Sequence, residues 1–144
     1  MAVTYQNNWK MILTALKNKI RAEIKCPVYS NFDNESRANQ FIRIVPTGST
    51  QEEKASFLET REFNMQCQYY FTRKKDANFQ NYVLSQVSLL EALVHDNITL
   101  DLSDSTKAYN VTMGTLDLDV EIDEYDDYFV AQWDLSCLHS GNAN

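Results

Sequence analysis

The stretch REFNMQCQYYFTR, residues 61 to 73, alternates between two kinds of side chain along its whole length. Apolar residues occupy every second position, and mostly polar residues lie between them. Because successive side chains of a β-strand point to opposite faces, this period of two predicts a strand with one buried face. The apolar positions are Phe63, Met65, Cys67, Tyr69 and Phe71.

Shorter segments on both sides of this strand show related patterns. Residues 40 to 45 are apolar and stop at Pro46, and residues 123 to 127 form an acidic turn between two alternating segments. Consecutive strands joined by short turns pair antiparallel. We therefore expect strands at residues 28–30, 40–45, 108–113, 116–122 and 128–137.

Two segments have the apolar spacing of amphipathic helices. The first runs from about Asn8 to Lys25 and precedes Pro27, and the second begins after Asp76 and ends near Asn97. Two such helices can cover one face of a sheet. The expected fold class is α+β, a largely antiparallel β-sheet covered on one face by two amphipathic helices, in the order α-β-β-β-α-β-β-β.

The length of 144 residues suits one continuous core, so we expect a single domain over residues 1–144. Residues 138–144 are expected to form a flexible tail. Polar residues dominate the segment 47–60, which we predict to be the longest loop. Its candidate functional residues are Thr47, Gly48, Ser49, Gln51, Glu52, Glu53 and Lys54.

The chain offers little of the chemistry that an enzyme needs. Its three cysteines are widely spaced and are expected to be free thiols, and its two histidines lack the partners of a zinc site. The acidic residues after Leu116 alternate with apolar ones, as in a strand and unlike a calcium loop. We expect no enzyme activity, cofactor or metal. The alternative is a metal-binding enzyme module that uses the acidic hairpin.

Charged residues are divided unevenly between the two halves of the chain. Residues 1 to 75 hold 12 Lys and Arg against 7 Asp and Glu, a balance of +5, whereas residues 76 to 144 hold 1 against 13, a balance of −12. Opposite charges on one domain favour head-to-tail association of identical copies. The expected subunit interface joins the basic Lys10, Lys17, Arg21, Arg73, Lys74 and Lys75 to the acidic Asp117, Asp119, Glu121 and Asp123.

The polar faces of the long strands are unusually neutral. They carry amides and tyrosines where solvated strands often carry Lys and Glu, and interfaces are enriched in tyrosine and depleted of charge. We add Tyr70 and Tyr128 to the expected interface. An ordinary solvent face rich in amides is the alternative. The residues of this face are Gln66, Gln68, Tyr70, Tyr128, Val130 and Gln132.

The whole layout resembles a known family. It combines a helix around Trp9–Ile20, strands, a second helix at Asn78–Val94, and closing strands that reach Cys137. The strands lie at Phe41–Val45 and Arg61–Thr72, and the local sequences are Tyr69-Tyr70-Phe71, Leu89–Leu93 and Asp126–Asp134. In this order the chain is similar to the tail terminator proteins of long-tailed bacteriophages.

This resemblance implies a role and partners, and it carries over no catalytic residue. It implies a homo-oligomeric ring, of six copies, that caps the tail tube at the tail–neck junction of the virion after assembly in the host cytoplasm. The ring would contact the major tail protein and a head-completion or connector protein, and double-stranded DNA would pass through it without sequence preference. Residues 47–60 would contact the tube or line the lumen.

Related ring proteins fit this resemblance almost as well. A head-closure protein or neck adaptor would differ mainly in its partner. A tail-tube subunit should have longer sheets and usually one helix, so two helix patterns favour the terminator. No segment approaches the roughly 18 uninterrupted apolar residues that span a bilayer, so no membrane partner is expected.

Overall fold

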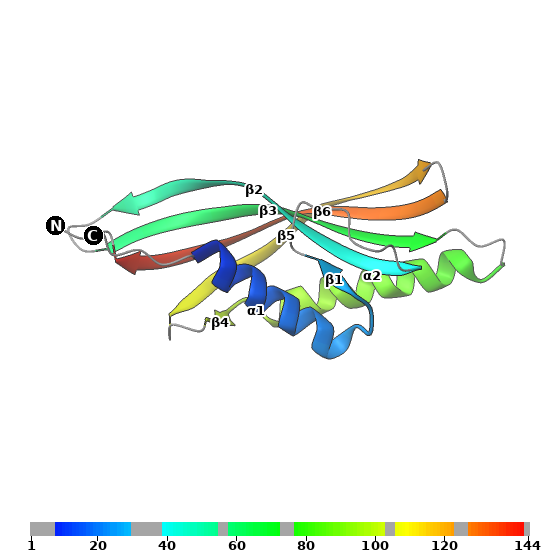
Figure 1. The fold of residues 1–144 in the computed structure, drawn as a ribbon, viewed down its shortest axis with the longest axis horizontal. Coiled ribbons are helices and arrows are strands. Elements are labelled where there is room, and N and C mark those ends of the chain that lie inside the picture. Colours follow the sequence, from blue (N-terminus) through cyan, green and yellow to red (C-terminus); the bar gives the residue numbers. More distant parts are fainter. Residues whose placement is uncertain are drawn as a thin grey trace.

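The computed structural model describes residues 8–29, 39–54, 58–72, 77–102, 106–122 and 127–142. Two helices and a curled, mixed β-sheet make an α+β fold, in which the long strands run along the longest axis (Figure 1). No helix in these ranges is both long and apolar enough to cross a bilayer. The elements are α1 (Asn8–Glu23), β1 (Val28–Tyr29), β2 (Gln40–Lys54), β3 (Leu58–Thr72), α2 (Phe79–Asp96), β4 (Leu100–Asp101), β5 (Lys107–Ile122) and β6 (Asp127–Asn142).

The six strands form one sheet in the order β1-β2-β3-β6-β5-β4. We expected a largely antiparallel sheet, but the sheet is mixed, because β1 pairs parallel with β2 at Val28↔Ile42 and Tyr29↔Arg43. A tight hairpin can join only antiparallel strands, and ten residues separate the end of β1 from the start of β2, which a parallel pair requires. The other neighbouring strands pair antiparallel.

The central pair, β3 with β6, confirms the alternation predicted for residues 61 to 73. Its register is unbroken from Leu58↔Asn142 to Thr72↔Tyr128. The apolar positions of β3 are buried, and opposite them lies Trp133, which is 0% exposed. The main buried cluster extends from these strands to residues of both helices, including Ile12 and Leu90. In Figure 1 both helices lie below the long strands.

A second cluster lies on the opposite face of the same strands. Phe41, Tyr70, Tyr128 and Val130 pack together there, and Tyr29 packs against them. Each is next in sequence to a residue of the main cluster, such as Ile42 or Tyr69, so its side chain points to the other face. The aromatic residues of this face are therefore already buried within the single chain.

Residues 47–54 form a strand, so our prediction of a loop over 47–60 is wrong. β2 continues through Pro46 to Lys54, and β3 begins at Leu58; residues 55–57 lie outside the described part. The register shifts between Pro46 and Gly48, where a bulge accommodates the proline in a strand near the edge of the sheet. The turn signal therefore marks a bulge and not the end of the strand.

The last third of the chain also differs from expectation. The segments 108–113 and 116–122 form one strand, β5, whose register shifts around Gly114, and a short strand, β4, precedes it. Residues 138–142, expected in a flexible tail, belong to β6 and pair with residues 58–62 of β3. The backbone ladder holds this segment although its side chains lack apolar alternation.

The long strands extend beyond the helices. Strands of 15 or 16 residues span about 50 Å, whereas helices of 16 and 18 residues span about 24 to 27 Å. The β2–β3 and β5–β6 hairpins accordingly lie at opposite ends of the long axis (Figure 1). The helices cannot cover both ends.

Candidate assembly interface

On each side of the sheet a short strand covers only part of the outer edge of a long one: β1 covers part of β2, and β4 covers part of β5. β1 covers β2 only at Ile42 and Arg43, and no other described residue pairs with that edge as far as Lys54. On the other side, β4 covers the start of β5, and Val111 donates its backbone N–H to the carbonyl oxygen of Ile98 at 3.0 Å. Beyond Val111, the described chain leaves the edge of β5 open. Open edges can pair with another chain.

Irregularities occur in the two open strands and not in the central pair. β2 shifts register at Pro46/Gly48 and at Gln51/Glu53, and β5 shifts at Tyr109/Thr112 and at Met113/Leu116. Within β5, Asn110 has a φ of 55°, in the left-handed region that asparagine tolerates. Bulges of this kind limit unspecific pairing at a sheet edge. The bulges therefore make the two edges poor templates for indiscriminate pairing.

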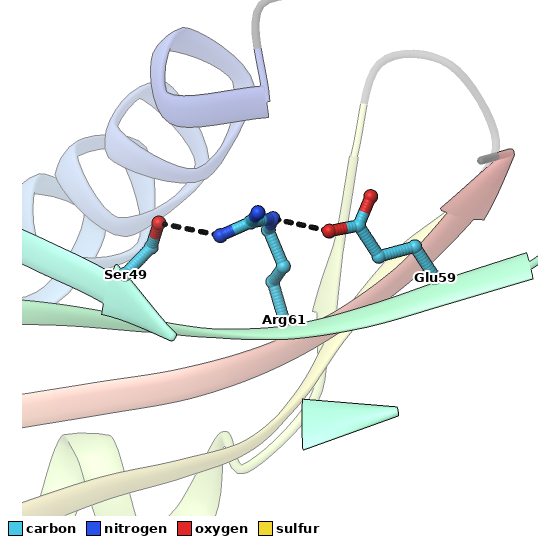
Figure 2. Close-up of polar contacts among 3 residues, drawn as sticks. All are labelled: Ser49, Glu59 and Arg61. Atoms are coloured by element: carbon cyan, nitrogen blue, oxygen red, sulfur yellow. Dashed lines mark hydrogen bonds and ion pairs between the residues drawn. The ribbon is translucent and has the colours of Figure 1, made fainter. Parts of the chain in front are cut away.

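Residues 47–54 and 58–61 form a polar end of the sheet, which we call the hairpin arm. Figure 2 shows two polar contacts of Arg61 in this arm, one with Ser49 of β2 and one with Glu59 of its own strand, β3. Arg61 donates from Nη1 to Ser49 Oγ at 3.2 Å, and its Nε lies 2.5 Å from Glu59 Oε1. The Arg61 side chain is 40% exposed, so these contacts organise a surface rather than a core.

One row of residues crosses the sheet from β1 to β5 at a single level. Tyr29 lies opposite Arg43, Arg43 opposite Gln68, Gln68 opposite Gln132, and Gln132 opposite Asp117. In its centre, Gln68 Nε2 donates a hydrogen bond to Gln132 Oε1 at 3.3 Å. We call these five residues the cross-strand row. It has a cation towards the β1 side and a carboxylate at β5.

Arg43 is held against the aromatic cluster of the outer face. Its guanidinium carbon lies 5.6 Å from the centre of the Tyr70 ring and 5.9 Å from that of Phe41. These two rings stack on each other with centroids 4.6 Å apart. Arg43 Nε is buried and has no hydrogen-bond partner among the described residues. Cation–π attraction therefore replaces part of the lost hydration of this charge.

A pocket of 590 Å³ opens beside β1, at one side of the sheet. Lys17 and Arg21 lie one helical turn apart on α1, and Lys25 follows the end of that helix. No carboxylate lines the pocket within the described chain, so the lining side chains carry a net positive charge. We call it the basic pocket, and it is lined by Lys17, Arg21, Ile24, Lys25, Cys26, Pro27, Val28 and Tyr29.

The thiols do not form a reactive site. Cys26, Cys67 and Cys137 are free, as expected. Burial raises the pKa of the Cys67 thiol and of the Cys137 thiol to about 12, and burial also raises the pKa of Cys26, against the effect of a hydrogen bond with Tyr69. The nucleophilic thiolate is therefore scarce at neutral pH. Among the described residues, no three His, Cys, Asp or Glu side chains are grouped to hold a metal.

The predicted interface residues fall into three groups. Lys17 and Arg21 line the basic pocket, and Lys10 is exposed on the same helix. Asp117 is exposed on β5, and residues 119 and 121 lie further along that strand. Residues 73–75 and 123, together with the centre of the acidic hairpin, lie outside the described part of the chain.

Tyr70 and Tyr128, expected at a partner surface, are buried within the chain. Their exposed fractions are 7% and 2%, which leave little area for a partner. Sequence reasoning also missed two polar residues. Arg43 showed no signal beyond its place in an apolar strand, and His139, expected in the tail, is buried and lies 2.9 Å from Thr106 Oγ1 through its Nε2.

Comparison with known proteins adds evidence on the fold only. No family model matches the chain. No curated protein matches it either. One solved structure, which carries no functional description, superimposes with a TM-score of 0.52 over 94% of this chain and 92% of that chain, at 12% sequence identity. At this identity the similarity shows a shared α+β architecture.

Proposed function

We propose that the chain is a structural subunit of a homo-oligomeric ring that terminates a phage tail tube and joins it to the head or neck. Double-stranded DNA passes through the lumen of this ring. The subunit has no catalytic role and needs no cofactor. Its place is the tail–neck junction of the virion, and it assembles in the host cytoplasm.

The observation that carries the proposal is the pair of open edges on one sheet. β2 and β5 lie on opposite sides of the central β3–β6 pair, and each is covered over a short part of its described length. Two different edges on one subunit favour head-to-tail contacts between copies. Such contacts close into a ring when a whole number of copies completes one full turn. The number six comes from the resemblance to tail terminators.

The arrangement of the helices supports the same proposal. We propose that α1 and α2 form one layer on one face of the sheet, since residues such as Leu16 and Val87 join the same buried cluster as the long strands. A layer on one face leaves both edges accessible. It also leaves the outer face, with its central amides, directed away from the helices and available to line the lumen or meet a partner.

Charge supplies a second line of support. Two basic side chains of α1, Lys17 and Arg21, share a pocket with Tyr29 of β1, and Asp117 lies on β5. In a head-to-tail ring these opposite sides meet. Exposed ion pairs are weak and screened by salt, so they mainly set orientation and register.

The hairpin arm is the proposed contact with the tail tube or the lumen. It lies at one end of the long sheet, and residues 47 to 51 are exposed. A variant with Thr47, Ser49 and Gln51 replaced by alanine keeps the backbone ladder and removes the polar side chains. We expect phage carrying it to produce tails of altered length or tails not joined to heads, seen by electron microscopy. Normal tails and normal joining would exclude the arm from this contact.

A tail-tube subunit is the second candidate, and one observation favours it. Four strands of 15 or 16 residues make a long sheet, which is typical of tube proteins, whereas two helices are typical of terminators. Negative-stain microscopy of the purified chain separates the two. Single rings that bind the end of a preformed tube indicate a terminator or a neck ring, and stacked rings indicate a tube subunit. Rings that bind only a head connector indicate head closure.

A further inference from the structure

We propose that the basic pocket receives the acidic end of β5, residues 117–122, from a neighbouring copy of this chain. The inference rests on the proposed ring and names the two surfaces that meet in it. It is more specific than a general attraction between basic and acidic regions, because it names the cavity that binds and the strand end that is bound.

The pocket has the chemistry of a carboxylate receptor. Three of its lining side chains, Lys17, Arg21 and Lys25, are cations, and no described carboxylate neutralises them within the pocket. Val28 and Tyr29 line it from β1 and supply apolar surface beside the charges. A cation in a partly enclosed site gains more from a carboxylate than a cation in open water does.

The strand end carries matching charge. Residues 117–122 include three carboxylates, those of Asp117, Asp119 and Glu121, and no cation. Asp117 is exposed, and no described strand pairs with the outer edge of β5 at its level. Leu118, next to it, is an apolar residue that is 46% exposed in the single chain. A partner that offers both cations and apolar surface therefore fits this segment.

The cross-strand row places these two surfaces at the same level of the sheet. Tyr29, which lines the pocket, and Asp117 stand at its two ends. When copies are placed side by side with their sheets in line, the end of one row meets the start of the next. Asp117 of one copy then arrives beside the pocket of its neighbour without a shift along the strands.

The size of the cavity agrees with a short segment as its occupant. A volume of 590 Å³ lies within the range of roughly 300 to 1,000 Å³ that is usual for ligand sites. It is too small for a folded domain and large enough for a few side chains. Phosphates of DNA are the other anions that such a pocket could attract. The cross-strand row favours the strand end of a second copy, because it places Asp117 at the same level of the sheet as the pocket.

Charge reversal in the full-length chain tests the assignment. Arg21→Glu reverses a charge that lines the pocket, and Asp117→Lys reverses the proposed partner. Lys19→Glu is the matched control, since Lys19 is exposed on α1 and does not line the pocket. Assembly is measured by sedimentation at low salt, with circular dichroism to establish that each variant folds. Binding of a short DNA duplex is measured alongside.

We expect Arg21→Glu and Asp117→Lys each to raise the concentration for half-assembly by on the order of tenfold or more. The double variant should recover most of that loss, and Lys19→Glu should change it by less than about threefold. Failure of the double variant to recover, or an equal effect of Lys19→Glu, would overturn the assignment while the ring stands. Loss of DNA binding in Arg21→Glu with unchanged assembly would make the pocket a phosphate site. A wild-type chain that stays monomeric would reject the ring and the assignment together.

Discussion

Tyr29 in β1 and Asp117 in β5 lie at opposite ends of one row that crosses five strands of the sheet. The unbroken β3–β6 ladder fixes the centre of this row. The positions of Tyr29 and Asp117 along the strands are therefore set by the register of the sheet. One end adjoins the basic pocket, and the other carries an exposed carboxylate. The two sides of the subunit are therefore matched in level as well as in charge.

Trp133 connects the sheet to α2 by more than packing. Its side chain is fully buried, and Nε1 donates a hydrogen bond to Glu91 Oε2 at 3.2 Å. Trp133→Phe removes a hydrogen bond to a charged acceptor and puts a smaller ring into a fully buried site, so we expect a loss of about 1.5 to 3 kcal/mol in the free energy of unfolding. Urea denaturation followed by circular dichroism measures it. Trp9→Phe, at a half-buried position, should cost less, and equal losses would contradict this role for the hydrogen bond.

The buried thiols predict a loss of stability in alkaline solution. Burial raises the pKa of Cys67 and of Cys137 from 9.0 to about 12. In the unfolded chain these thiols ionise near pH 9, while in the folded chain they stay protonated. The unfolded state therefore binds fewer protons above pH 9, and the free energy of unfolding falls as pH rises from about 9 towards 12.

Cysteine substitution isolates this effect. The slope contributed by one such thiol approaches about 1.4 kcal/mol per pH unit. Cys67→Ala lowers stability at neutral pH through the lost packing, but the loss between pH 9 and 11 should become shallower than in the wild type. Denaturation curves at several pH values show the difference. An unchanged slope would mean that Cys67 does not titrate between the two states.

Gly114 and Gly48 differ in the space around them. A Cβ added at Gly114 would lie 3.3 Å from the backbone oxygen of Asp134, whereas nothing lies within 4 Å of a Cβ at Gly48. Gly114→Ala forces β5 and β6 apart and should cost about 1 to 2 kcal/mol. Gly48→Ala should be neutral or stabilise by up to about 1 kcal/mol, because it restricts the unfolded chain. Thermal denaturation of both variants compares them, and the reverse order would count against the described register of β5.

Replacement of Arg61 should change binding to the tail protein more than it changes the stability of the fold. Its contacts with Ser49 and Glu59 are at the surface, so Arg61→Ala should lower the free energy of unfolding by less than about 1 kcal/mol. If the hairpin arm meets the tail tube, the same variant should bind the purified major tail protein more weakly, as measured by co-sedimentation. Lys107→Ala, which removes an exposed contact with Asp101 of 3.5 Å, is the control. Equal binding by both variants would argue against the arm as a contact.

Local patterns revealed the central strands and both helices. The alternation from Phe63 to Phe71 and from Phe129 to Cys137 is visible because each strand has one face in the main core. The bounds were harder to predict, since Pro46 and Gly48 usually end a strand and here mark a bulge. The residues after Leu138 lack apolar alternation, and only pairing with β3 shows that they belong to the sheet.

The interface could be predicted only in part. Charge counts pointed to α1 and to the region after Leu116, but composition carries no information on register. The parallel pairing of Tyr29 with Arg43 and the position of Asp117 depend on contacts between residues far apart in the sequence. Tyr70 and Tyr128 were assigned to a partner surface because their alternation places them on the polar face. The second cluster on that face buries them within the chain.

The mass of the purified chain in solution, measured by sedimentation at low and at high salt, tests the central claim most directly. A closed ring held by matched edges and screened charges should have a mass of several copies at low salt, six by the resemblance, and should dissociate at least partly at high salt. A monomer at both salt concentrations, with the major tail protein present as well as absent, would contradict the ring.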